Sequence, residues 1–172
     1  MTLTRRQIVE LLADNGLKPS RALGQNFVAD PNTARRIARL AAVGPGDQVV
    51  EIGAGLGSLT MALAGTGARV TVIELDRYLL PVLRGLVEPL GVAVIEGDAL
   101  RLDWQALTGA GPDPWVLVAN LPYNVATPLV ADLLDFVPAI GRMLVMVQRE
   151  VGERLAAQPG TKAYGAVSVK VA

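Results

Sequence analysis

The sequence predicts an α/β protein built on a doubly wound, mostly parallel sheet. From residue 48 onward, short apolar runs of strand length alternate with longer amphipathic runs of helix length. The short runs are almost continuously apolar, as is typical of parallel strands that helices cover on both faces. Of the 172 residues, 51% are hydrophobic, so the chain has enough apolar surface to bury the core of one domain.

Two helices are expected ahead of this alternation. Apolar residues near the N-terminus recur at roughly helical spacing and predict a first helix that ends near Gly16. Residues 18–30 then form a loop. Asp30 is expected to cap a second helix, because Pro31 follows it at the first helical position, and this helix should reach about Val43.

The alternating part defines the order of the remaining elements. Its strands are expected at 48–52, 69–74, 92–96, 115–119 and 143–147, and its helices at 59–64, 79–87 and 129–136. The tail at 164–172 alternates apolar and polar residues as a strand would. Ligands of such sheets bind at the carboxyl ends of the strands, so those ends are where we look for a site.

Composition excludes several kinds of chemistry. The chain contains no Cys and no His, which rules out a thiolate nucleophile, a Ser-His-Asp relay, a disulfide and the usual zinc sites. No apolar run approaches the roughly 20 residues that cross a bilayer, and residues 1–10 lack the apolar run of a signal peptide. We therefore expect a cytoplasmic protein with neither a metal site nor a membrane partner.

Charge is balanced overall but uneven along the chain. The chain has 16 basic and 16 acidic residues, yet residues 1–40 hold seven basic against three acidic ones. A basic arm on an acidic body indicates a polyanionic partner near the N-terminus. Solvated helix faces would explain the same pattern equally well.

A glycine-rich loop follows the first expected strand. Gly53, Gly55 and Gly57 would let the backbone approach a ligand closely at a strand-to-helix turn, where free N–H groups point outward. Ser58 stands where the nicotinamide-dinucleotide pattern has Gly or Ala, so the loop departs from that pattern. The loop alone is compatible with a ligand site and with an ordinary tight turn.

Acidic residues stand at or shortly after the ends of the next two expected strands. Glu74 lies 21 positions after Gly53, where an acid that accepts hydrogen bonds from ribose hydroxyls is expected. Dinucleotide enzymes and nucleoside-cofactor methyltransferases both need this acid, so it does not separate them. Asp98 follows the third strand and would meet the same sheet edge, where its carboxylate could accept from an adenine amino group.

The fourth strand runs into Asn120-Leu121-Pro122-Tyr123, the most specific feature of the chain. Tyr123 offers an aromatic face for stacking a planar base, and Asn120 offers a carbonyl acceptor. A turn with a half-buried Tyr is the alternative, which would be favoured for a generic Pro-Tyr but not for this tetrapeptide at a strand end.

With these features the chain resembles the ribosomal RNA adenine N6,N6-dimethyltransferases, which are class I methyltransferases with a Rossmann-like sheet that use S-adenosylmethionine. The segments that carry the resemblance are residues 23–27 (LGQNF), 51–57 (EIGAGLG), 73–76 (IELD), 97–100 (GDAL), 120–124 (NLPYN) and 148–151 (QREV). Leu56 and Leu121, with Thr127-Pro128, resemble the small-subunit enzymes that dimethylate two adjacent adenosines near the 3′ end of 16S RNA.

The resemblance implies roles for individual residues. Asn26 and Val28 would close over the cofactor, Glu74 would meet its ribose and Asp98 its adenine. The residues implied in cofactor binding are Asn26, Val28, Gly53, Gly55, Glu74, Asp98 and Asn120, and those implied in catalysis are Asn120, Leu121, Pro122 and Tyr123. No metal is implied, and the expected partner is 16S RNA within the small subunit or its precursor, bound by a monomer.

The resemblance also implies an organisation along the chain. Residues 1–46 would form N-terminal helices and a loop that covers the cofactor, and residues 47–172 a methyltransferase core that lacks the family's last strands and its C-terminal domain. The chain alone is then expected to be inactive. The family places a helix at 164–172, against the alternation of that segment, and we expect the helix.

Three other functions stay open on the sequence. A non-catalytic RNA-binding factor of ribosome assembly would use the basic arm, and a large-subunit RNA adenine methyltransferase of the macrolide-resistance type would share most motifs. A nicotinamide-dependent oxidoreductase rests only on the glycine loop and Glu74, and the tetrapeptide from Asn120 speaks against it.

Overall fold

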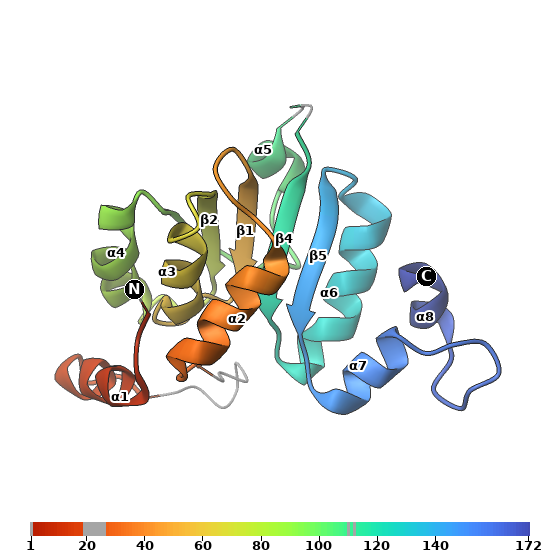
Figure 1. The fold of residues 1–172 in the computed structure, drawn as a ribbon, viewed down its shortest axis with the longest axis horizontal. Coiled ribbons are helices and arrows are strands. Elements are labelled where there is room, and N and C mark those ends of the chain that lie inside the picture. The colour runs from red at the N-terminus through yellow and green to blue at the C-terminus, as the bar shows by residue number, and fades with distance from the viewer. Residues whose placement is uncertain (1, 19–26, 110, 112) are drawn as a thin grey trace.

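Five parallel strands form the sheet, as the sequence predicts. The computed structural model describes residues 2–18, 27–109, 111 and 113–172. The strands lie across the sheet in the order β3-β2-β1-β4-β5 with every neighbouring pair parallel, and Figure 1 shows β1, β2, β4 and β5 running in the same direction. The strands are β1 (Gln48–Ile52), β2 (Arg69–Glu74), β3 (Ala93–Glu96), β4 (Trp115–Asn120) and β5 (Ile140–Met146).

The strand order reverses beside β1. The chain adds β2 and β3 on one side of β1 and then returns to place β4 and β5 on the other. Ile52, the last residue of β1, is level with Ile73 of β2 and with Ala119 of β4. The three loops that follow these strands therefore leave the sheet at one edge, on either side of the reversal, which is where doubly wound folds bind ligands.

Helices cover both faces of the sheet. The helices of the chain are α1 (Arg5–Asp14), α2 (Pro31–Ala41), α3 (Ser58–Ala64), α4 (Leu80–Val87), α5 (Trp104–Thr108), α6 (Tyr123–Phe136), α7 (Arg149–Leu155) and α8 (Ala166–Val171), with a 3₁₀ turn η1 (Glu88–Leu90). Val49 belongs to a core shared with α1 to α4, whereas Val50 belongs to a core shared with α6, α7 and α8. This division follows from the alternation of side chains along a strand. The described residues contain no helix long and apolar enough to span a membrane.

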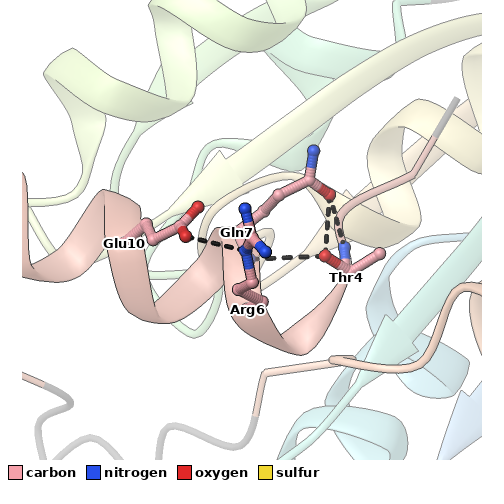
Figure 2. Close-up of polar contacts among 4 residues, drawn as sticks. All are labelled: Thr4, Arg6, Gln7 and Glu10. Atoms are coloured by element: carbon pink, nitrogen blue, oxygen red, sulfur yellow. Dashed lines mark hydrogen bonds and ion pairs between the residues drawn. The ribbon is translucent and has the colours of Figure 1, made fainter.

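The N-terminal helices begin at residues that cap them. Thr4 Oγ1 accepts a hydrogen bond from the Gln7 amide, and the Gln7 side chain accepts one from the Thr4 amide (Figure 2). Arg6 pairs with Glu10 on the exposed side of the same helix at 2.8 Å. The predicted cap of α2 is confirmed, because the Asp30 carboxylate accepts from the amides of Asn32 and Thr33.

Some boundaries differ from the prediction. Helix α6 begins at Tyr123, six residues ahead of the expected start, with Pro128 inside it. The apolar run that predicted this helix begins only at Leu129, after the proline. The short helices α5 and α7 were not foreseen, and β5 begins at Ile140, three residues early. Of the expected loop at 18–30, residues 19–26 lie outside the described part, and residues 27–30 belong to no helix or strand.

The C-terminal tail is a helix, so its strand-like alternation was misleading and the family expectation for it is confirmed. In α8, Val167 and Ser168 are buried, and the Ser168 hydroxyl donates to the Arg154 carbonyl. The tail thus packs on helices α6 and α7 through Val167 and does not pair with the sheet, whereas Val169 and Val171 are exposed.

Removal of the α2 cap should destabilise the fold. Asp30→Ala leaves two amides at the helix start without acceptors, and we expect the free energy of unfolding in urea to fall by about 1 kcal/mol. Asp14→Ala is the matched control, because Asp14 ends α1 at its C-terminus, where a carboxylate is not favoured. Equal losses for both variants would contradict the capping role.

Candidate functional site

A cavity of about 290 Å³ opens at the carboxyl ends of the strands. Its walls combine the ends of β1 to β4 with Ile8 of α1 and with Phe27 and Val28 ahead of α2. In Figure 1, α1 lies at the end of the sheet to which the strand arrows point. Eight of the ten residues that the sequence singles out line this cavity: Val28, Gly53, Gly55, Glu74, Asp98, Asn120, Leu121 and Pro122.

Backbone hydrogen bonds extend the sheet one residue beyond the ends of β1, β3 and β4. They fix the position at which the loop after each of these strands begins. The Gly53 amide donates to the Ile73 carbonyl at 2.8 Å, and the Gly97 amide donates to the Glu74 carbonyl at 3.0 Å. The Leu121 amide donates to the Met146 carbonyl at 2.9 Å. Because the strand ends are in register, residues far apart in the sequence meet around a single cavity.

The glycine loop adopts a conformation that side chains disfavour. Gly53 and Gly55 have φ values of +75° and +59°. A Cβ atom on Gly55 would lie 2.8 Å from a ring carbon of Phe27, closer than real contacts allow. The Phe27 ring thus packs directly on the loop. Phe27 was not singled out from the sequence, although it stands in one of the motif segments and is aromatic.

Glu74 ties the loop to the neighbouring strand. One carboxylate oxygen accepts from the Gly55 amide at 2.7 Å, and the other accepts from the Asp76 amide at 2.9 Å. Burial raises the pKa of Glu74 despite these hydrogen bonds. Each carboxylate oxygen has two lone pairs, so Glu74 retains acceptor capacity toward a ligand in the cavity.

Asp98 and Asn120 line the cavity at the ends of strands that lie on opposite sides of β1. Asp98 accepts from the Leu100 amide at 3.0 Å, and Arg101 lies 3.8 Å away as a loose ion pair. Asn120 ends β4, and Leu121 beyond it is buried. An amide and a carboxylate therefore both line this cavity, together with many apolar residues.

Of the two remaining residues from the sequence prediction, only Tyr123 can be placed relative to the cavity. Asn26 lies outside the described residues. Tyr123 begins α6 with 65% of its surface exposed, while its neighbours Pro122 and Asn124 contribute to the wall. Its ring therefore lies outside the cavity that the cofactor would occupy. A Tyr beside the cavity is free to meet a second ligand that approaches from solvent.

Glu51 is a buried acid of this site that sequence reasoning passed over. It precedes the end of β1, is 2% exposed and lines the cavity. Burial, with a smaller contribution from the charge of Glu74, raises the pKa of Glu51 to about 8, although the Thr60 hydroxyl lowers it in part. The position of Glu51 at the strand end, directly before the glycine loop, was the available signal.

The walls fit a nucleoside-like ligand better than a metal ion. The described residues contain no group of three or more His, Cys, Asp or Glu placed to hold a metal. Glu74 and Asp98 offer acceptors for hydroxyl and amino groups, and the glycine loop offers backbone close to the ligand. The apolar wall, which includes Ile73, Leu75 and Leu100, suits a planar ring.

A family model matches most of the chain. Residues 16–172 match the model described as ribosomal RNA adenine dimethylase. The ribosomal RNA small subunit methyltransferase A of Thermobifida fusca (strain YX) is 49% identical, over 99% of this chain and 60% of that protein. The same-named protein of Corynebacterium jeikeium (strain K411) is 51% identical, over 95% of this chain and 54% of that protein. The chain thus spans little more than half the length of these relatives.

Solved structures with similar folds include two RNA-modifying proteins. A dimethyladenosine transferase from Plasmodium falciparum superposes with a TM-score of 0.70 at 28% identity, over 83% of this chain and 50% of that chain. The 23S rRNA methyltransferase ErmE superposes with a TM-score of 0.67 at 29% identity, over 78% of this chain and 53% of that chain. Both likenesses confirm the expected fold class.

Substitution of Gly55 should disturb the loop beyond its backbone strain. Gly55→Ala and Gly16→Ala both place a side chain at φ near +60°, which costs roughly 1–2 kcal/mol. A Cβ on Gly16 would meet nothing within 4 Å, whereas one on Gly55 would displace Phe27. We expect Gly55→Ala to lose about 1 kcal/mol more in urea unfolding, as overpacking costs. Equal losses would show that Phe27 does not pack on the loop.

Proposed function

Because the chain belongs to the ribosomal RNA adenine dimethylase family, we propose that the whole protein dimethylates N6 of two adjacent adenosines near the 3′ end of 16S ribosomal RNA. The protein would act in the cytoplasm, as a monomer, on the small ribosomal subunit or its precursor, and so contribute to its biogenesis. The observation that carries this proposal is the convergence of four strand ends, Asn120-Leu121-Pro122 among them, on one cavity.

S-adenosylmethionine is the cofactor of this family, and the cavity fits it. We assign Glu74 to the ribose hydroxyls, Asp98 to the adenine amino group and the Gly53 backbone to the methionine part. Val28, together with Asn26, would cover the cofactor, as part of an N-terminal region at 1–46 placed over a core at 47–172. When bound, the cofactor supplies a methyl group on a positively charged sulfur.

The residues after β4 would prepare the adenine for attack. The N6 lone pair of adenine is delocalised into the ring, so it is a poor nucleophile. Carbonyl acceptors from Asn120 and the Leu121 backbone would hold the two amino hydrogens and favour a pyramidal nitrogen. Pro122 fixes the backbone at the start of α6 with φ of −66°. The catalytic gain then comes from positioning and polarisation.

This chemistry does not require a strong general base. The nitrogen becomes acidic once it is alkylated, and it can lose its proton to water. The absence of His from the sequence agrees with such a mechanism. Tyr123, exposed beside the cavity wall, would stack on the target base and align its nitrogen with the methyl group.

Large-subunit modification is the strongest competing function. The structural likeness to a 23S rRNA methyltransferase is nearly as high as that to the dimethyladenosine transferase. The sequence relatives favour the small subunit, because proteins named for it are about half identical to this chain. A non-catalytic assembly factor would be supported instead if the protein bound RNA but left it unmethylated.

Mass spectrometry of ribosomal RNA tests the function and the role of Tyr123 together. Cells that lack the protein should lose dimethyladenosine near the 3′ end of 16S RNA, and the wild-type gene should restore it. Tyr123→Phe should restore most of it, since the ring face does the holding. Tyr123→Ala should methylate about five- to 150-fold more slowly, because stacking on one base contributes about 1–3 kcal/mol.

Three results would contradict these proposals. Unchanged 16S RNA in the deletion strain would reject the substrate, and loss of 23S modification would favour the competing enzyme. If Tyr123→Phe were as damaging as Tyr123→Ala, the hydroxyl would have a chemical role and stacking would not explain the residue.

A further inference from the structure

Glu51 is a buried acid for which the proposed mechanism has no use. It lines the cavity on the face of β1 that α3 covers, and its Oε2 atom has no hydrogen-bond partner. Thr60 of α3 is fully buried, and its hydroxyl lies close enough to Glu51 to lower the pKa of that acid but makes no hydrogen bond of normal length. Unpartnered buried polar groups are rare and costly, so a pair of them beside a cavity calls for an explanation.

The ionisable side chains among the described residues that line this cavity are all acidic. Its wall carries the carboxyl groups of Glu51, Glu74 and Asp98, and no Lys or Arg is among its described lining residues. Glu74 is the acid whose charge acts on Glu51, and it raises the Glu51 pKa further above the value that burial sets. Glu51 is therefore mostly protonated at neutral pH in the protein alone, and none of the described lining residues supplies a compensating positive charge.

A cationic ligand would shift Glu51 from its protonated form to its ionised form. A fixed positive charge in a cavity of low dielectric constant favours the ionised carboxylate and lowers its pKa. The sulfonium of S-adenosylmethionine has such a charge at every pH, and the thioether left after methyl transfer has none. The Thr60 hydroxyl can then donate a hydrogen bond to the carboxylate, which would satisfy both unpartnered atoms.

We propose that Glu51 makes the cavity select the sulfonium cofactor over its neutral thioether product, by releasing a proton to solvent as the cation binds. The proposal rests on the function given above, because it needs this cofactor. Methyl transfer removes the positive charge, Glu51 takes a proton back, and the product is held less tightly. Dimethylation requires two cofactor molecules in turn. Weaker binding of the thioether product favours its replacement by a fresh cofactor molecule between the two methyl transfers.

Titration calorimetry with the whole protein measures how many protons are released when a ligand binds. Binding of S-adenosylmethionine at pH 7 is followed in buffers of different ionisation enthalpy, and S-adenosylhomocysteine is the neutral comparison. With the Glu51 pKa at about 8, binding of the cofactor at pH 7 should release close to one proton from Glu51, and binding of the product should release almost none. The affinity ratio of cofactor to product should rise up to about tenfold per pH unit from pH 6 and level off above pH 8.

Glu51→Gln and Glu10→Gln are the matched variants. Glu51→Gln should abolish the extra proton release, make the affinity ratio independent of pH and weaken binding of the cofactor more than of the product. Glu10→Gln makes the same chemical change on the exposed side of α1 and should behave as wild type. The amino groups of the two ligands titrate as well, so the difference between wild type and Glu51→Gln is the quantity that decides.

Unfolding of the ligand-free protein gives a second measurement. The folded state holds the Glu51 proton more tightly than the unfolded state, so the free energy of unfolding should fall as pH rises from about 4.5 to about 8. Glu51→Gln should reduce this fall, and Glu10→Gln should not. Equal pH dependence in all three proteins would overturn the proposed protonation.

The outcomes separate this inference from the proposed function. Tight cofactor binding with the same proton release in wild type and Glu51→Gln would overturn the role of Glu51 and leave the function supported. An unchanged affinity ratio in Glu51→Gln would do the same. Failure of the wild-type protein to bind the cofactor at all would overturn both.

Discussion

The parallel alignment of the strands is the constraint on which the candidate site depends. β1 pairs in register with β2 and β4, so Gly53, Glu74 and Asn120 reach the same edge of the sheet although nearly 70 residues separate the first from the last. A slip of one residue would exchange the faces of every side chain. Glu51 would then leave the face on which Thr60 lies, and the cavity would lose its buried acid.

The segment ahead of the sheet completes this edge. Ile8 and Val28 contribute to the cavity wall, and the Phe27 ring packs on the glycine loop. Leu3 and Ile8 belong to the same core as α3 and α4, and the Ser58 hydroxyl donates to the Leu3 carbonyl. The N-terminal helices are thus part of the packing that shapes the site, and ligand binding and their stability should be coupled.

Sequence reasoning succeeded where local chemistry decides the structure. The strands at 48–52 and 69–74 and the Asp30 cap follow from apolar runs and a helix-start signal, and the structure has them at those residues. It failed where distant contacts decide. The tail alternates as a strand would, yet it forms a helix that packs on α6 and α7.

Some residues of the candidate site could likewise be predicted from the sequence, and others could not. The strand-end acids and the tetrapeptide from Asn120 could be found because each follows a predicted strand. Phe27 and Glu51 were missed although both stand in motif segments, because the contact of Phe27 with Gly55 and the burial of Glu51 arise only in the folded chain.

Amide chemical shifts of the isotopically labelled protein test most directly whether this edge of the sheet binds the cofactor. On titration with S-adenosylhomocysteine, the largest changes should fall on the amides of Gly53, Gly55, Asp98 and Leu121, which lie around the cavity. Residues of the hollow between α2 and α3, such as Gly65 and Thr66, should change little. Changes confined to that hollow, or none at saturating ligand, would contradict the account.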